Sequence, residues 1–581
     1  MKSPLNETIK APKPSILKLL KPYSGMISAL LFFALLSNVL NLVIPKLIQI
    51  GIDDYSNGVW NMNRIVTWFS IAAILIFILT YLQSIIQTFA SEKVARDLRS
   101  KLSSKISQQD YAYIQDTTPG KLLTNLTSDV DAIKMFVSQA IVSIVSSIVL
   151  ILGAGILLVN INWKLGLAVL LIIPIIAITF FIIFKKVKTL FKKAQEVIDW
   201  LNKIINESIL GAALIRVLNA QYTEFNKFMD ANTEAKNLGL SILRLFATLI
   251  PIIVLTSNLG RLAVLALGGH FVIEGSMTLG EFAAFNSYIA ILIFPIIMIG
   301  FMSTVIARAS ASYQRIYNTL EAPDFEDKGT ITSPLKGNIE IKNVSVFYGE
   351  KPALKNISMN IAAGSRTAVI GPTAAGKSQL LYLLTTLIKP NEGAIFYDTI
   401  NITDYNQDAL LRQIGLVFQD SIIFNMSLRE NIAFNTEVTQ EDLQKAIDTA
   451  ELSDFIKSLP EGLDTIVSER GSSLSGGQKQ RIMLARALAI NPGILLLDDF
   501  TSRVDTLTEQ KISRNVKQNY PGLTLLSVTQ KISAVKDYDQ IVLMMEGEIL
   551  ARGKHEELLH SCPEYIQIYN SQKSTTAMAV S

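Results

Sequence analysis

The chain has 581 residues, which is too long for one domain and suits two to four. Half of its residues are hydrophobic and only 18% are charged, whereas soluble proteins average about 25% charged residues, so part of the chain is expected to lie in lipid. The net charge of +4 is small for this length and argues against a nucleic-acid partner, and the single cysteine excludes an intramolecular disulfide framework.

The first 24 residues are polar and basic, and the apolar run behind them is long enough to span a membrane. We therefore expect no cleavable signal peptide. Within this stretch, residues 14–23 place four apolar side chains among lysines. This pattern fits either an amphipathic helix at the membrane interface or an ordinary loop, and the sequence leaves both open.

Six segments in the first part of the chain have the roughly 20 mostly apolar residues that a membrane-spanning helix needs. They are residues 25–50, 64–89, 137–159, 165–184, 245–272 and 282–306. A soluble domain has no core large enough for six such stretches. We therefore predict an α-helical membrane domain over residues 1–309, followed by an α/β domain.

The loops between the spans differ in charge. The long connections, about 90–136 and 185–244, carry many lysines and arginines, whereas the three opposite loops are short and poor in basic residues. Because basic loops stay on the cytoplasmic side, both long connections and both termini are predicted to be cytoplasmic. Helical spacing and little proline predict that the spans continue as helices beyond the bilayer.

Several polar residues fall inside the predicted spans. They are Ser37, Asn38, Asn41, Asn258, Arg261, Asn286 and Ser287. Polar groups are costly in lipid, and they either line a transport path or form hydrogen bonds between helices. The sequence does not choose between these two roles.

The second part of the chain has a different character. Residues 310–337 are polar and contain prolines and a glycine, so they are predicted to form a linker. From residue 338 to residue 572, short strands alternate with helices, which is typical of an α/β domain. The last residues, 573–581, are expected to form a disordered tail.

A phosphate-binding loop follows the apolar strand at Ala368–Ile370 and precedes an apolar helix. Its sequence fits the P-loop pattern G-x-x-x-x-G-K-[ST], in which backbone N–H groups and a helix N-terminus surround phosphates. The predicted ATP-binding residues are Gly371, Thr373, Ala374, Ala375, Gly376, Lys377, Ser378 and Gln379. We expect Lys377 to reach the β and γ phosphates and Ser378 to ligate Mg²⁺.

Two further motifs belong to the same domain. Four apolar residues precede Asp498, as in a strand covered on both faces, and this aspartate is expected to hold Mg²⁺. Ser475, Gly476, Gly477 and Gln478 open a helix and form a second anion-binding nest. A single domain does not need two phosphate loops, so this second loop is expected to serve a nucleotide held by another domain.

With these three motifs the chain resembles ABC transporter exporters that fuse six spans to one nucleotide-binding domain. The resemblance implies that Tyr348 stacks on adenine and that Gln419 both ligates Mg²⁺ and senses the membrane domain. It also implies a D-loop at Ser502 and Asp505 and an exporter-specific loop at residues 469–471. Coupling helices are expected near residues 116–128 and 219–225.

Two positions depart from this family together. Asp499 stands where the family has a catalytic glutamate, and Gln530 stands where it has a switch histidine. Aspartate is one methylene shorter, so its carboxylate lies about 1.5 Å further from the attacking water, and glutamine cannot become a cation. Ala374 and Gln379 also replace the usual glycine and threonine. ATP binding is expected to persist, with weak hydrolysis at this site.

An intact signature loop beside an altered ATP site resembles the degenerate-site subunit of heterodimeric multidrug exporters. The resemblance implies a second half-transporter as partner and cargo that is an amphipathic drug or lipid. It also implies a multi-pass membrane protein that contacts membrane lipids. The absence of a transit peptide favours a bacterial plasma membrane. The alternatives are a homodimeric exporter with two slow sites and an ATP-gated channel or regulatory subunit. The six spans exclude a soluble P-loop enzyme.

Overall fold

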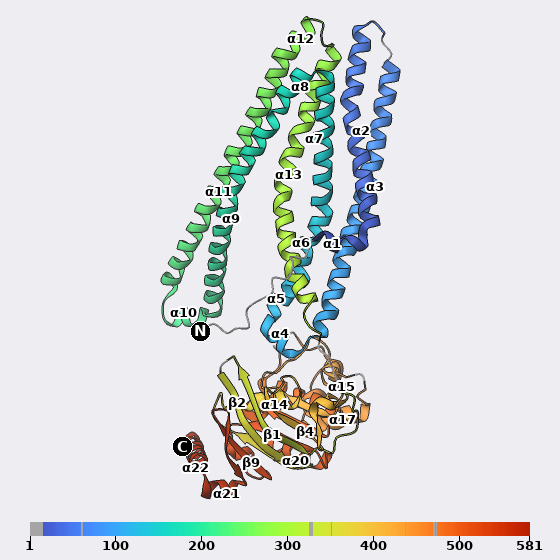
Figure 1. The fold of residues 1–581 in the computed structure, drawn as a ribbon. Coiled ribbons are helices and arrows are strands. Elements are labelled where there is room, and N and C mark those ends of the chain that lie inside the picture. The colour runs from blue at the N-terminus through green and yellow to red at the C-terminus, as the bar shows by residue number, and fades with distance from the viewer. Residues whose placement is uncertain are drawn as a thin grey trace. The chain divides into compact units, whose positions relative to one another are not determined.

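The computed structural model describes residues 16–59, 62–324, 329–349, 351–435, 437–468, 471 and 473–580. The chain divides into two compact units (Figure 1). The first unit contains Met1–Gln108 and Thr117–Pro323, and the second contains Gln109–Asp116 and Asp324–Ser581.

The first unit is helical, as predicted. Six of its helical stretches are long and apolar enough to cross a membrane: Lys21–Ser56, Met62–Ser107, Pro119–Ile161, Trp163–Leu210, Gln221–Ile273 and Leu279–Leu320. Each stretch contains one predicted span, so the six spans are confirmed, and the helices continue well beyond them. The elements in chain order are α1 (Ile16–Leu19), η2 (Lys21–Tyr23), α2 (Ser24–Ser56), α3 (Met62–Ser107), α4 (Tyr111–Thr117), α5 (Pro119–Thr124), η3 (Asn125–Asp129), α6 (Val130–Met135), η4 (Phe136–Ala140), α7 (Ile141–Ile161), α8 (Trp163–Leu170), α9 (Ile172–Leu210), α10 (Ala212–Val217), α11 (Gln221–Ala263), η5 (Val264–Gly268), α12 (Gly269–Ile273) and α13 (Leu279–Leu320).

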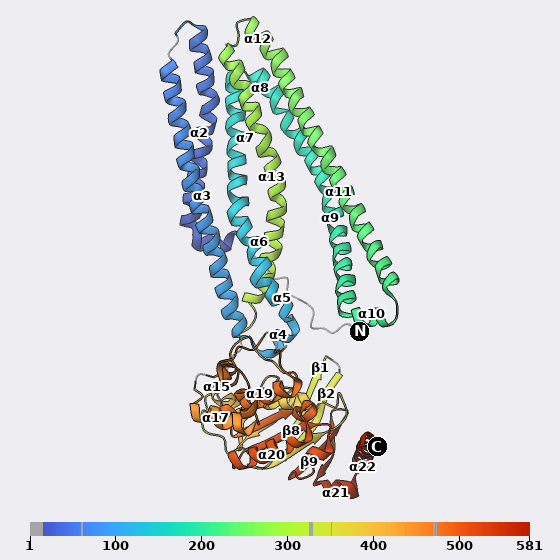
Figure 2. The ribbon, with the colours of Figure 1, turned by 180° about the vertical axis from the view of Figure 1, so that it is seen from behind.

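Helices α9 and α11 form an antiparallel hairpin whose tip is α10, and they diverge from α7 and α13 toward that tip (Figures 1 and 2). A second coupling helix was expected near residues 219–225, where the structure has the start of α11, with the short helix α10 directly before it. Gly211 caps α9, and Asn219, with φ +51°, interrupts the helical path before α11 begins. Near the first expected position, residues 116–128, the structure has α5 and η3, and Thr118, with φ +67°, separates them from the short helix α4.

The N-terminal segment is described from residue 16 onward, so Pro14 and Ser15 lie outside the described residues. It forms the short helix α1 and the turn η2, which pack on the protein. Leu20 and Tyr23 are buried against α3 and α13, and the Tyr23 hydroxyl donates to Asp97 at 3.0 Å. This segment therefore differs from a free loop.

Two of the seven polar residues that the sequence places in the spans join neighbouring helices. The Ser37 and Thr80 hydroxyls lie 3.1 Å apart, and Asn38 Nδ2 donates to Ser146 Oγ at 2.7 Å, so both pairs join neighbouring helices. Asn41, Asn286 and Ser287 donate instead to backbone carbonyls one turn earlier in their own helices. Asn258 and Arg261 have exposed side chains in α11.

The predicted linker, residues 310–337, differs from the structure at both ends. Helix α13 continues to Leu320 because Tyr313 and Ile316 keep helical spacing and pack into the core around α3 and α6, while Arg315 Nε donates to the buried Asp129 at 2.9 Å. At the other end, the backbone N–H of Leu335 donates to Gln413 Oε1 at 2.7 Å. Residues 329–337 contain no helix or strand apart from the single bridge between Ile331 and Tyr405.

The second unit contains two sheets and the helices that cover them. The antiparallel sheet has the order β2 (Lys351–Ile361), β1 (Ile339–Tyr348), β4 (Glu392–Tyr397), β5 (Ile400–Asn401). The larger sheet has the order β10 (Glu548–Gly553), β9 (Gln540–Met545), β3 (Arg366–Ile370), β8 (Thr524–Thr529), β7 (Ile494–Asp498), β6 (Ile414–Val417). Its helices and turns are α14 (Lys377–Leu384), η6 (Ile402–Asp404), α15 (Gln407–Leu411), α16 (Leu428–Ile432), α17 (Gln440–Thr449), α18 (Ser453–Lys457), η7 (Gly462–Asp464), α19 (Gly476–Ala489), η9 (Phe500–Arg503), α20 (Thr506–Asn519), η10 (Ile532–Ala534), α21 (His555–Ser561) and α22 (Pro563–Val580). This is the predicted α/β domain.

The register of the larger sheet brings the carboxyl ends of β3, β7 and β8 to one edge. Strand β8 lies between β3 and β7 and is parallel to both. Ile370, the last residue of β3, pairs with Thr529, and Asp498, the last residue of β7, pairs with Val528. The segments that follow these strands therefore emerge side by side at the carboxyl ends, where open α/β sheets bind ligands.

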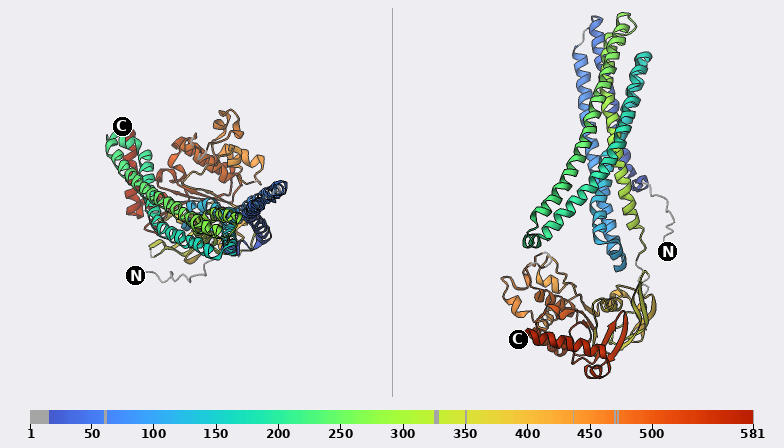
Figure 3. Two further views of the ribbon diagram at one scale, coloured as in Figure 1. Left: turned by 90° about the horizontal axis from the view of Figure 1, so that it is seen from above. Right: turned by 90° about the vertical axis from the view of Figure 1, so that its left-hand side faces the viewer.

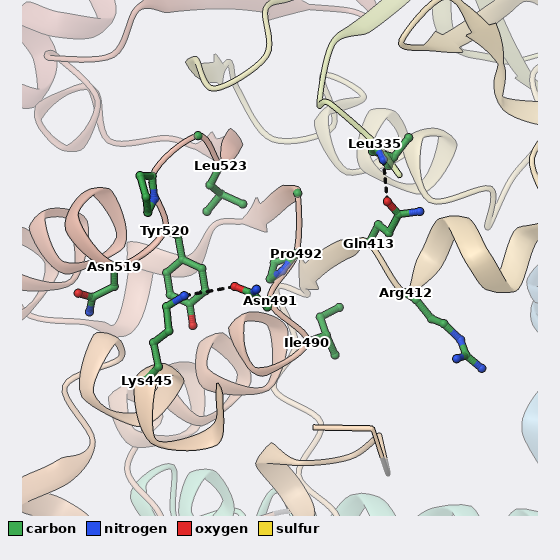
Figure 4. A pocket seen from close by; sticks show the side chains of 13 residues that line it. Leu335, Arg412, Gln413, Lys445, Ile490, Asn491, Pro492, Asn519, Tyr520 and Leu523 are labelled. Carbon is green, nitrogen blue, oxygen red and sulfur yellow. Dashed lines mark hydrogen bonds between the residues drawn. The ribbon is translucent and has the colours of Figure 1, made fainter. Parts of the chain in front are cut away.

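A cavity of about 510 Å³ lies at the opposite edge of that sheet, beside the amino ends of β7 and β8 (Figure 4). Gln413 holds the connecting segment there through Leu335, and the Lys445 ammonium lies 4.0 Å from the centre of the Tyr520 ring. None of the predicted site residues lines this cavity.

The C-terminal residues also differ from the prediction. Residues 573–580, expected to be disordered, continue helix α22, shown in dark red in Figure 3. The helix begins at Pro563, a favourable first position, and Tyr565 in its first turn is fully buried. Packing of this first turn starts a helix that the polar composition of the segment does not suggest.

Candidate nucleotide-binding site

The P-loop connects β3 to α14 through a tight turn with two residues of positive φ. Gly376 has φ +91°, and a Cβ there would lie 2.6 Å from the Ala353 carbonyl oxygen, so only glycine fits. Ala374 has φ +65°. The left-handed region costs a non-glycine residue about 1–2 kcal/mol, so the alanine that replaces the family's glycine is strained.

One cavity of about 380 Å³ collects most of the predicted site residues. It is lined by Tyr348, Ala353, Thr373, Ala374, Ala375, Gly376, Lys377, Ser378, Gln379, Gln419, Asp498, Asp499, Val528, Thr529 and Gln530. The structure therefore brings together the P-loop, the end of β7 and the end of β8. Gly371 lies at the base of the loop, where a Cβ would meet the Met544 carbonyl oxygen at 2.1 Å.

Lys377 occupies the centre of the loop and is 8% exposed. Its ammonium donates to the carbonyl oxygens of Gly371 at 2.9 Å and Pro372 at 2.7 Å. Burial lowers the pKa of Lys377, and the carboxylates of Asp498 and Asp499 oppose this shift. A buried ammonium at the wall of a cavity suits an anionic ligand. Phosphate oxygens would accept stronger hydrogen bonds from it than the two carbonyl oxygens do.

Asp498, Ser378 and Gln419 were predicted to hold Mg²⁺. Asp498 is 3% exposed, and burial raises its pKa, while the Ser378 hydroxyl donates to its carboxylate and opposes that shift. The Gln419 side chain lines the same cavity. Hydroxyl, carboxylate and amide oxygens are the donors that Mg²⁺ prefers, so these residues fit the ion.

Asp499 has the left-handed backbone, with φ +47°, which aspartate tolerates better than most residues. Its carboxylate accepts a hydrogen bond from the backbone N–H of Gln530. Burial raises the pKa of Asp499, and Lys377 and Lys531 oppose this shift. The Asp499 carboxylate, at the position of the expected base, is therefore hydrogen-bonded to the loop that carries Gln530, the other altered residue.

Tyr348 and Gln379 form a direct contact that the sequence does not predict. The Tyr348 hydroxyl donates to Gln379 Oε1 at 2.7 Å, and the tyrosine ring is 56% exposed at the end of β1. Gln379 replaces the family's threonine, and here its amide fixes the aromatic side chain at the mouth of the cavity. An exposed aromatic ring at the mouth of the cavity can stack on the adenine base of a nucleotide.

The signature residues are not part of this cavity. Ser475 caps α19: its hydroxyl accepts from the N–H of Gln478 at 3.2 Å, and its own N–H donates to Gln478 Oε1 at 2.8 Å. Gly476 and Gly477 follow in the first turn, against Arg503, which lies in the expected D-loop. Glu469 and Arg470 of the expected exporter-specific loop lie outside the described residues.

Sequence reasoning missed several residues near the site. Ala353, Val528 and Thr529 line the cavity, and no motif marks them. Tyr382, on α14, lies 5.8 Å from Tyr111 between ring centroids, and both belong to the second unit. Burial raises the pKa of Tyr382 to about 12. Only a three-dimensional arrangement reveals this pairing, because it joins segments 271 positions apart in the sequence, from residue 111 to residue 382.

Comparisons with known proteins agree with this arrangement. Residues 27–296 match the ABC transporter transmembrane region, and residues 354–502 match the ABC transporter family model. The multidrug resistance-like ATP-binding protein MdlA of Buchnera aphidicola is 32% identical over 568 residues, which cover 96% of this chain and 97% of that protein. The chain belongs to the ABC transporter family.

Other members of the ABC transporter family share the full length of this chain. The ATP-dependent lipid A-core flippase of Syntrophus aciditrophicus is 30% identical, and the match covers 96% of this chain and 94% of that protein. A solved bacterial Atm1-family ABC exporter with ATP bound has the same fold, with a TM-score of 0.78, 24% identity and coverage of 94% of this chain and 98% of that chain.

This ABC transporter is thus a multi-pass membrane protein in which an ATPase domain couples hydrolysis to transport. Its cavity is lined by Lys377, Ser378 and Asp498, the residues expected to bind ATP and Mg²⁺.

Proposed function

We propose that the chain is one subunit of a heterodimeric ATP-driven exporter, that it binds ATP at a degenerate site, and that it lends its signature loop to the partner's hydrolytic site. One observation carries this proposal. The cavity contains Lys377, Ser378 and Asp498, the residues expected for binding, but it has the altered residues Asp499 and Gln530 at the positions expected for hydrolysis. The signature helix, in contrast, keeps its serine, both glycines and its capping box.

In this proposal ATP is held by the P-loop and Tyr348, and Mg²⁺ is held by Ser378, Gln419 and Asp498. The ion would screen phosphate charge as the terminal phosphate is transferred to water. Asp499 and Gln530 orient that water poorly, so this site retains ATP for long periods. The partner's site, closed by Ser475–Gln478, performs most of the turnover that resets the transporter.

The tip of the α9–α11 hairpin supports the need for a second chain. It exposes Leu210 (80%), Leu214 (61%), Val217 (83%) and Leu218 (65%). Exposed apolar patches rimmed by polar residues mark interaction sites in soluble parts of proteins. A partner half-transporter is the occupant that the proposed heterodimer supplies.

The relatives guide the choice of cargo. One is named as a flippase for lipid A-core and another as resembling multidrug resistance proteins. We therefore propose amphipathic lipids or drugs as cargo, and a bacterial inner membrane as the location, with both termini and the basic loops in the cytoplasm.

The decisive experiment measures ATPase activity of the purified full-length chain in lipid nanodiscs, alone and together with the candidate partner. We expect slow hydrolysis alone and a rate at least about 10²-fold higher with the partner, the usual contribution of a positioned base. A fast, self-sufficient homodimer would overturn the proposal. Ion flux independent of turnover would instead indicate a channel.

A further inference from the structure

One side chain of the C-terminal helix holds the loop that carries Gln530. The Gln572 Nε2 donates to the backbone carbonyl oxygen of Gln530 at 2.6 Å, and the Gln572 Oε1 accepts from the backbone N–H of Ile532 at 3.0 Å. The two ends of one amide thus bind two backbone groups of one loop. Because donor and acceptor cannot be exchanged freely, both bonds require one orientation of the amide and one position of α22.

The start of α22 is fixed to the domain independently of Gln572. Tyr565 is fully buried, and its hydroxyl lies 2.7 Å from His555 Nδ1. The ammonium of Lys536 lies 5.4 Å from the centre of the Tyr569 ring. Tyr569 and Gln572 are three residues apart, so they share one face of the helix. The anchored first turns therefore carry Gln572 to the loop.

The same loop reaches the nucleotide cavity from its other side. The backbone N–H of Gln530 donates to the Asp499 carboxylate, and the Gln530 side chain lines the cavity with Lys377. The two backbone polar groups of residue 530 are thus held by different partners, Asp499 toward the cavity and Gln572 toward α22. A displacement of α22 would move the peptide groups that place the Gln530 side chain.

We propose that Gln572 is a positioning residue for the nucleotide site: α22 sets where Gln530 lies in the cavity, and ATP in the cavity in turn stabilises the docked position of α22. Such coupling is reciprocal, because each event changes the free energy of the other equally. The inference rests on the proposed function only in requiring that the cavity binds ATP. It does not require a heterodimer or slow hydrolysis.

The test uses the full-length chain in nanodiscs and measures dissociation of a fluorescent ATP analogue, mant-ATP, in the presence of Mg²⁺. Gln572→Ala removes both hydrogen bonds, whereas Gln572→Glu keeps the acceptor for Ile532 and loses the donor to Gln530. We expect dissociation about 3–10-fold faster in both variants, the range that one or two net hydrogen bonds give.

Gln567→Ala is the matched control. Gln567 is the same residue type on the same helix. Its side chain is exposed, and that side chain forms no hydrogen bond within the described part of the chain. We expect this variant to dissociate mant-ATP at the wild-type rate, within about 1.5-fold, because exposed substitutions rarely matter. Equal effects at positions 567 and 572 would overturn the proposal.

A double-mutant cycle separates positioning from a merely structural role. If Gln572 acts through residue 530, then Gln572→Ala changes dissociation by less than about 2-fold in a Gln530→Ala background. Additive effects of the two substitutions would overturn the proposal. Absence of mant-ATP binding in the wild-type chain would instead overturn the proposed function, so the two failures are distinguishable.

A second measurement needs no variant. Hydrogen exchange of α22 in the wild-type chain should slow when ATP is added, at the amides near Tyr569 and Gln572, because bound nucleotide holds the loop that Gln572 contacts. Unchanged exchange at saturating ATP would contradict the reciprocal coupling.

Discussion

The P-loop cavity and the start of α19 are both suited to phosphate, and they differ in how many of the expected groups they keep. The cavity has Asp499 and Gln530 at the positions for activating water, and the strained Ala374 in its loop. The start of α19 has its serine, both glycines and a complete capping box. In the proposed function, the groups expected for binding are thus retained in both places, while those expected for hydrolysis are altered in one.

This difference indicates that binding and hydrolysis are separable within one domain. Binding uses backbone N–H groups, a lysine and a helix N-terminus, and these tolerate substitutions around them. Hydrolysis needs a carboxylate and a hydrogen-bonding side chain at fixed distances from a water molecule, so one methylene matters. A composite site shared by two chains lets one chain lose the second set without losing the transporter's turnover.

The largest effect is expected from Ser475→Arg, which tests the role of the intact side. The arginine would place a bulky cation at the positive end of α19 and remove the cap. ATPase activity of the assembled transporter should fall by at least about 10²-fold, the loss typical of a removed group that stabilises transition-state charge. Mant-ATP binding to this chain's own cavity should remain as in the wild type.

Ser475→Ala is the control for that variant. It removes the cap and the hydroxyl without adding bulk or charge. It should cost about 1 kcal/mol of helix stability and lose less ATPase activity than Ser475→Arg, because the rest of the loop can still close on the partner's nucleotide. Full activity in Ser475→Arg would show that this loop caps no working site and would remove the contrast between the two regions.

The next effect tests the altered side. Restoring both groups, as Asp499→Glu with Gln530→His, should raise hydrolysis at this site by about 10–10²-fold, a part of the range for a positioned base. Each single variant should gain less than its share, because the two side chains act on one water. Single-turnover hydrolysis of γ-labelled ATP by the full-length chain measures the gain.

Asp499→Asn controls for this experiment. Asparagine also tolerates the left-handed backbone at position 499, so it changes the charge without adding strain. It should abolish residual hydrolysis and leave ATP binding intact. If the double variant hydrolyses ATP no faster than wild type, the two substitutions are not the cause of the expected slow turnover.

Much of this arrangement follows from the sequence alone. Six apolar segments predict the spans. The P-loop, Asp498 and Gln530 each stand at the end of a short apolar strand, and the sheet brings these three strand ends to one edge. The reason is local: each motif continues a strand, and parallel strands end together. The signature loop is likewise predicted, because serine and two glycines specify a helix start without help from distant residues.

Other features depend on distant contacts and escaped prediction. Residues 310–320 are polar in composition, but Tyr313 and Ile316 make them the buried end of α13. Residues 573–580 extend α22 because Tyr565 docks its first turn. The contacts of Gln572 with the backbone near residue 530 and the Tyr348–Gln379 hydrogen bond join residues far apart in sequence. No periodicity or motif encodes such pairs.

A smaller effect is expected from the backbone of the P-loop. Ala374→Gly should stabilise the loop by about 1 kcal/mol, because glycine adopts positive φ without steric cost, partly offset by its greater freedom when unfolded. The neighbouring Ala375→Gly is the matched control: Ala375 does not have positive φ and is 2% exposed, so that change should destabilise. Hydrogen exchange of residues 371–377 in the nucleotide-free chain measures both. Equal effects would exclude strain at position 374.

The smallest effect concerns pH and sets the two regions apart once more. Burial raises the pKa of Asp498 and of Asp499 above the ordinary value of about 4, whereas Ser475–Gln478 contain no titratable group. Binding of Mg²⁺–ATP needs the Asp498 carboxylate ionised, because Asp498 is the expected Mg²⁺ ligand, so affinity should fall as pH decreases through its raised pKa. The sign is opposite for the empty domain: its raised carboxyl pKa values stabilise it at low pH, and that contribution is lost as pH rises through them. The affinity for mant-ATP should therefore fall toward acid between about pH 4 and 8, and the Asp499→Asn variant should show the same dependence because Asp498 is retained. A pH-independent affinity in the wild type would mean that Asp498 does not change ionisation on binding.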